Sequence, residues 1–130
     1  MSLLRLVTEI DGMELPSTAN LREHWRARAS RTQTHRRLGR VMLAPKFALH
    51  AAALRAALAG DGITVRITRV APRALDDDNL ATACKSLRDG IADALRAFGV
   101  RDDRDARVRW EYAQGRGAPR QRAVRVEVTA

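Results

Sequence analysis

The sequence is poor in the residues that build disulfides and zinc sites. Its 130 residues include one cysteine, Cys84, which excludes an intrachain disulfide and a cysteine-based zinc site. The three histidines, His24, His35 and His50, have none of the spacings of a histidine metal motif. No apolar run approaches a membrane span, and the first residues lack the core of a signal peptide. We therefore expect a cytoplasmic protein that uses neither a membrane nor a small-molecule cofactor.

Lysine is almost absent too, whereas arginine is abundant. Lys and Arg together number 24, of which 22 are arginine, against 15 Asp and Glu, which gives a formal net charge of +9. Such a balance is typical of proteins that bind polyanions. The charge is uneven, at +7 in residues 1–70, −2 in residues 71–106 and +4 in residues 107–130. An acidic island inside a basic protein is the feature that a functional hypothesis has to explain.

Apolar periodicity predicts a single α+β domain over residues 1–130. The clearest signal lies in residues 80–98, where apolar residues recur at helical spacing up to Gly99. The glycine-rich stretch 115–119 indicates a hairpin between the last two strands. The predicted order is β-α(α)-β-α-β-β, with a small mixed sheet and helices mainly on one face. Its elements are strands near 3–10, 62–70, 107–114 and 123–129, and helices near 21–59 (kinked or interrupted at Pro45) and 79–98.

Two groups of aspartates flank the predicted helix 79–98. Asp76, Asp77 and Asp78 precede it, and Asp102, Asp103 and Asp105 follow it. A helix N-cap explains one aspartate, but consecutive carboxylates repel one another unless a cation neutralises them. Ligands that are all oxygen suit Mg²⁺ or Mn²⁺ rather than zinc. Because this helix is roughly 30 Å long, the two groups can share an ion only if the loop after it folds back.

The motif Leu75-Asp-Asp-Asp-Asn-Leu80, followed by an amphipathic helix and by Gly99-Val-Arg-Asp-Asp103, resembles the RusA-like endodeoxyribonucleases. These are Holliday-junction resolvases of phages and prophages. The resemblance implies a homodimer that nicks four-way DNA junctions with Mg²⁺, in DNA recombination and repair. It also implies that Asp76, Asp78 and Asp103 are the metal ligands and catalytic carboxylates.

One position departs from the family pattern. The best-known members have a lysine four residues after the second motif aspartate, where this sequence has Thr82. Lys85 follows Asp78 by seven residues and therefore lies on the same helical face. It is a candidate catalytic cation for the phosphate, and the alternative is a solvated surface lysine.

A third signal is the arginine-rich segment 20–40, whose only acidic residue is Glu23. Arginine suits phosphate because its planar guanidinium donates two parallel hydrogen bonds. We expect DNA contacts here, with a merely solvated helix face as the alternative. Trp25 and Trp110 follow apolar periodicities, which favours core packing over stacking on DNA bases. The expected DNA-binding residues are Arg22, Arg26, Arg28, Arg31, Arg36, Arg37 and Arg40.

These observations favour a Mg²⁺-dependent, structure-selective endodeoxyribonuclease that acts on four-way junctions as a homodimer. Two alternatives stay open. One is a non-catalytic DNA-binding phage protein whose aspartates only cap a helix and shape a turn. The other is a nuclease that acts on other branched substrates.

Overall fold

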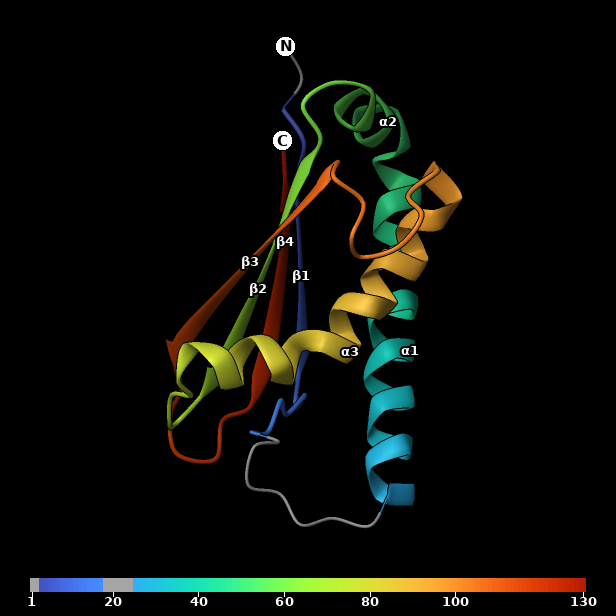
Figure 1. Cartoon of the computed structure of the whole chain (residues 1–130). Helices are drawn as coiled ribbons and strands as arrows, with labels where there is room; N and C mark the ends of the chain where they lie inside the picture. The colour runs from blue at the N-terminus through green and yellow to red at the C-terminus, as the bar shows by residue number, and fades with distance from the viewer. Residues whose placement is uncertain (1–2, 18–24) are drawn as a thin grey trace.

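A four-stranded mixed sheet organises the fold, with the strands in the order β1-β4-β2-β3 (Figure 1). The structure is a computed structural model that describes residues 3–17 and 25–130. Strand β4 is antiparallel to both of its neighbours, and β2 is parallel to β3. The predicted α+β class and mixed sheet are confirmed. The strands are β1 (Arg5–Asp11), β2 (Ile63–Ala71), β3 (Val108–Arg116) and β4 (Ala123–Thr129).

The helices gather mainly on one side of this sheet, as expected from the one-sided alternation of the strands (Figure 1). Alternate residues of β1, β2 and β4 are buried, because successive side chains of a strand point to opposite faces. In Figure 1 the first turns of α3 pass across the lower end of the strands, and its last turns run beside α1. The helices are α1 (Trp25–Leu49), α2 (Ala51–Ala59) and α3 (Asp77–Leu95), which continues into a 3₁₀ turn, Arg96–Phe98.

The predicted hairpin between the last two strands is wrong. Strand β4 lies between β1 and β2, whereas β3 lies at the sheet edge beside β2. Residues 115 and 116 belong to β3 rather than to a turn. The physical reason lies in the side chains: β4 buries Val124, Val126 and Val128 in the core, while β3 exposes Arg109 and Glu111. The more apolar strand takes the central place, where it pairs on both sides.

The expected break in the first helical stretch lies at His50 rather than at Pro45, because α1 continues past Pro45 and ends at Leu49. Two fully buried residues, Leu43 and Phe47, flank the proline and hold this turn against the core. The chain bends by 94° between α1 and α2, at His50. Among the described residues no single helix is both long and apolar enough to cross a membrane. Only α1 and α2 counted together, across the bend, are apolar enough over that length.

Helices α1 and α3 pack closely because each carries a glycine where they cross. A Cβ added to Gly39 would lie 2.6 Å from the carbonyl oxygen of Leu87, and one added to Gly90 would overlap the carbonyl oxygen of Arg36. Only glycine permits such backbone contact. The predicted apolar stripe of α3 is confirmed, since Leu80, Cys84, Leu87, Ile91 and Leu95 are all buried.

Candidate functional site

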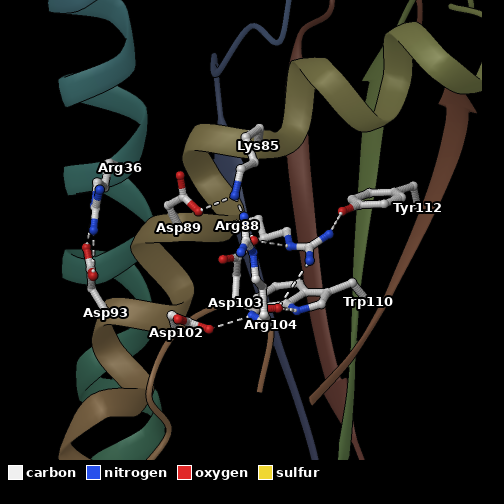
Figure 2. A network of polar contacts seen from close by, with 10 residues as sticks. All are labelled: Arg36, Lys85, Arg88, Asp89, Asp93, Asp102, Asp103, Arg104, Trp110 and Tyr112. Atoms are coloured by element: carbon white, nitrogen blue, oxygen red, sulfur yellow. Dashed lines mark hydrogen bonds and ion pairs between the residues drawn. The ribbon is translucent and has the colours of Figure 1, made fainter. Parts of the chain in front are cut away.

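The loop after α3 folds back on the helix and places Asp103 beside its middle turns. The Asp103 carboxylate lies 2.7 Å from Lys85 Nζ and 2.9 Å from Arg88 Nε (Figure 2). Gly99, with φ of +88°, supplies the left-handed residue that ends the helix and starts this return. The side chain of Asp103 is 12% exposed, while that of Lys85 is 54% exposed. A fixed carboxylate therefore faces a more accessible ammonium group.

Arg88 holds Asp103 from the side of the sheet. Its Nη1 donates to the Tyr112 hydroxyl at 2.6 Å, and its Nη2 donates to the backbone carbonyl of Asp103 at 3.1 Å. Trp110 Nε1 donates to the same carbonyl at 2.8 Å, and the guanidinium lies 4.9 Å from the centre of the indole ring (Figure 2). The 2.9 Å contact of Arg88 Nε is an ion pair without hydrogen-bond alignment. Strand β3 thus fixes the backbone of Asp103 directly through Trp110, and it acts on the carboxylate through Arg88, which Tyr112 holds.

This cluster is charged at neutral pH. Burial alone would raise the pKa of Asp103, but the hydrogen bond and charge of Lys85, with the charge of Arg88, outweigh it and lower that pKa. Burial would likewise lower the pKa of Lys85, yet its hydrogen bonds to Asp103 and Asp89 raise it. Lys85 Nζ lies 2.8 Å from Asp89 Oδ1. Lys85 therefore joins two carboxylates, one on its own helix and one on the returning loop.

The other predicted ligands lie at the start of α3. Asp76 is the N-cap, and its Oδ1 accepts the backbone N–H of Asn79 at 3.0 Å. Asp78 lies in the first helical turn and is exposed. The Gln114 side chain bonds both the N–H and the C=O of Leu75, at 2.8 and 2.7 Å, so that β3 also fixes the approach to this helix start.

The structure brings Lys85 and Asp103 together, and it does not bring Asp76 and Asp78 to Asp103. Within residues 3–17 and 25–130, no three His, Cys, Asp or Glu side chains are grouped closely enough to hold one metal ion. The chemistry of two exposed carboxylates, Asp76 and Asp78, fits Mg²⁺, which takes one or two carboxylates and keeps several waters. In this arrangement Asp103 is paired with cations instead. The three-carboxylate site stays a prediction.

The predicted basic segment does not form one face. Arg36 makes a two-point ion pair with Asp93 of α3, at 2.7 and 3.0 Å. This pair lowers the pKa of Asp93 and raises that of Arg36, chiefly through the side-chain hydrogen bond. Arg28 and Arg31 line a cavity between α1 and α3. The remaining members are Arg26, Arg37 and Arg40, which are exposed on α1, and Arg22, which lies outside the described residues.

The two tryptophans differ from each other. The preference for a core position is wrong for Trp25, which is 67% exposed at the start of α1. This end of the helix reaches past the ends of the strands (Figure 1). The preference is confirmed for Trp110, which packs at the edge of the core and against Arg88.

Comparison with known proteins adds no further constraint: no protein-family model, no curated protein and no solved structure matches this chain. The resemblance to RusA-like nucleases therefore rests on the motif residues alone. The sequence reading missed Arg88 and Tyr112, which no motif marks. It also missed Asp89, although the spacing of four residues from Lys85 is a recognisable helical ion-pair signal.

Proposed function

We propose that the protein is a Mg²⁺-dependent endodeoxyribonuclease that nicks four-way DNA junctions as a homodimer. The observation that carries this proposal is the 2.7 Å contact between Lys85 and Asp103. It joins the helix that begins with the aspartate motif to the later aspartate pair, as a shared site requires. The contact also lies beside a basic cavity lined by Arg28 and Arg31.

Each group has a role that follows from its position. Asp76 and Asp78 would hold the ion, which supplies an activated water and neutralises charge at phosphorus. Lys85 presents a positive charge to the phosphate, where negative charge develops during attack. Asp103 keeps the ammonium in place, and Arg88 positions Asp103. The arginines of α1 offset the repulsion between DNA and this acidic site.

A second candidate is a non-catalytic DNA-binding protein. It is favoured by the structural use of two of the three aspartates. Asp76 caps α3, and Asp103 is neutralised by Lys85 and Arg88. In that case the acidic island stabilises the fold, and only the basic residues face DNA.

Nicking of a labelled four-way junction in Mg²⁺ separates the two candidates. We expect Asp78→Asn and Asp103→Asn to reduce the single-turnover rate by at least about 100-fold while junction binding is kept or tightened. Asp76→Asn should do the same without harm to the helix, since asparagine is as good an N-cap as aspartate. Asp77→Asn is the matched control and should cleave normally. Tight binding with no nicking by the wild type, at any Mg²⁺ or Mn²⁺ concentration, would favour the second candidate.

A panel of substrates then defines the preference. Forks, flaps, linear duplex and structured RNA are compared with the four-way junction under the same conditions. We expect the four-way junction to be cut fastest. Faster cleavage of a flap or fork would keep the nuclease and change its substrate.

A further inference from the structure

The cavity between α1 and α3 has a volume of about 410 Å³ and is lined mostly by polar side chains. Its existence follows from the glycine crossing of the two helices. The helices touch at Gly39 and Gly90, and the cavity lies on the N-terminal side of this contact in both of them. The lining residues from α1 are Arg28, Arg31, Thr32 and His35, and those from α3 are Thr82, Ala83, Lys85, Ser86 and Asp89, with Pro16 at the margin.

The lining is suited to an anion. It carries the charges of Arg28, Arg31 and Lys85 against that of Asp89, which is bonded to Lys85. Burial, together with the charge of Arg31, lowers the pKa of His35, so that its imidazole is neutral at pH 7. Among the described residues, the side chains that line the cavity therefore sum to a net positive charge.

The donors come from both walls of the cavity. On α1, Thr32 offers a hydroxyl beside Arg28 and Arg31, and on α3 Ser86 offers one beside Lys85. Mixed guanidinium, ammonium and hydroxyl donors are the groups that contact phosphates in protein–DNA complexes. Both helices line the cavity, which we call the groove, so a chain of phosphates that entered it would meet donors from both walls.

The position of the groove links it to the site described above. Lys85 lies in both, since its ammonium contacts Asp103 and its side chain lines the groove. Asp78 lies on the same helical face as Lys85, about two turns toward the N-terminus. A strand that enters the groove past Lys85 would continue toward the exposed start of α3.

Helix α1 also carries arginines that cannot reach this groove. Arg26 and Arg37 are eleven residues apart, so they lie on one helical face, about 160–180° around the helix from His35. Neither lines the groove. The same helix thus offers an inner and an outer pair of arginines with equal charge.

We propose that the groove between α1 and α3 is the seat of a single phosphodiester strand of DNA, contacted by Arg28 and Arg31 from one wall and by Lys85 from the other. This inference rests on the DNA-binding part of the proposed function and is independent of cleavage. This proposal narrows the set of DNA-binding arginines expected from the sequence, because it gives the outer pair, Arg26 and Arg37, only a long-range attraction to DNA.

The test compares two double variants that each remove two positive charges from α1. Binding of a fluorescein-labelled four-way junction is measured by anisotropy in EDTA, over a range of salt concentrations. We expect R28A/R31A to weaken binding roughly tenfold per arginine and to reduce the slope of log affinity against log salt by about two. R26A/R37A should weaken binding less than about threefold, because exposed charges away from the strand are screened. Equal losses in the two double variants would overturn the proposal.

A second pair of variants guards against effects on folding. Thr32→Glu places a carboxylate in the groove, and Gln33→Glu places one about 100° farther around the same exposed helical segment, outside the groove lining. We expect at least a tenfold loss of binding, on the order of one repelled phosphate contact, for the first variant, and little change for the second. Similar losses in both would overturn the proposal, provided that far-ultraviolet circular dichroism shows both variants folded.

Two further outcomes keep this inference separate from the proposed function. If the groove variants lose binding but the wild type never nicks DNA, the groove proposal is supported and the proposed nuclease activity is rejected. If the wild type nicks junctions but the inner and outer variants bind DNA equally well, the proposed nuclease activity is supported and the groove proposal is rejected. Competition with thymidine monophosphate distinguishes a strand from a free phosphate group. If the nucleotide displaces the labelled junction as effectively as unlabelled junction does, at equal phosphate concentration, the groove binds a free phosphate group and the proposal of a DNA strand is overturned.

Discussion

The two aspartate groups have similar composition but different surroundings. At residues 76–78, Asp76 caps α3, whereas the carboxylates of Asp77 and Asp78 make no hydrogen bond or ion pair with any residue that the structure describes. At residues 102–105, each aspartate has a partner. Asp103 pairs with two cations, and Asp102 accepts the backbone N–H of Arg104 at 2.8 Å.

Asp105 shows how far this engagement goes. It accepts the backbone N–H groups of Arg101 and Arg107 at 3.2 and 3.1 Å and pairs with the Arg107 guanidinium at 2.8 Å. These bonds, with the side-chain bond from Arg107 as the largest cause, lower the pKa of Asp105 strongly. The later group therefore shapes a loop, while the earlier group keeps two carboxylates for an outside partner. Local charge density alone does not separate these roles.

The sharpest test of this difference is the cost of removing one charge from each group. We expect Asp103→Asn to lower the free energy of unfolding by about 2 kcal/mol, because it leaves Arg88 without its counter-ion and leaves Lys85 with Asp89 alone. Asp78→Asn should change it by less than about 0.5 kcal/mol, since an exposed residue without partners contributes little. Urea denaturation of both variants measures the two values. A cost for Asp78→Asn as large as that for Asp103→Asn would contradict the distinction.

Much of the fold is predictable from local patterns, and the helix α3 shows why. Its buried residues recur at one spacing, and its ends are set by an N-capping aspartate and a left-handed glycine. The order of the strands in the sheet, in contrast, cannot be predicted from local patterns. The placement of β4 between β1 and β2 depends on pairing across long sequence distances, which the glycine-rich loop after β3 does not encode. The signal that was present is the exposed charge on β3, which marks an edge strand.

The candidate site likewise has a part that the sequence predicts and a part that depends on contacts between distant segments. The pairing of Lys85 with Asp103 could be anticipated only as a return of the loop to α3, because helical spacing places Lys85 but not the loop. Arg88 was not predictable, since its contacts with Tyr112 and Trp110 come from a strand more than twenty residues away. Likewise, the arginines of α1 read as one cluster in the sequence, but the helix distributes them around its axis.

Arg88 offers the next test, because the later group depends on it. We expect Arg88→Lys to lower the free energy of unfolding by about 1.5 kcal/mol, since lysine cannot bond Tyr112 and the Asp103 carbonyl at once. The exposed Arg101 gives the control, and Arg101→Lys should be silent. In a Trp25→Phe background, Trp110 is the sole tryptophan, and its fluorescence should change in the first variant only. Unchanged fluorescence would show that Arg88 does not fix this side of Asp103.

A third test concerns Asp76, the member of the group 76–78 whose side chain caps α3 by a hydrogen bond to the backbone N–H of Asn79. We expect Asp76→Ala to cost about 1 kcal/mol, through loss of the N-cap, and Asp76→Asn to cost only a few tenths. Thermal unfolding of the two variants measures the difference. If both variants are destabilised equally, the charge of Asp76 rather than its capping hydrogen bond stabilises the protein. Asp76 would then resemble the aspartates at 102–105, whose charges are paired.

The smallest expected effect is on the pH dependence of stability, and its sign follows from the direction of the pKa shift. The pKa of Asp103 is lower in the folded protein than its ordinary value, which is about 4 in an unfolded chain. Its contribution to stability is therefore complete above that value and is lost as the pH falls below about 4. The difference in unfolding free energy between the wild type and Asp103→Asn should shrink over this range. Urea titrations at a series of pH values measure this difference, and a difference that stays constant from pH 7 to the acid limit would show that the cations do not hold the Asp103 carboxylate in its charged form.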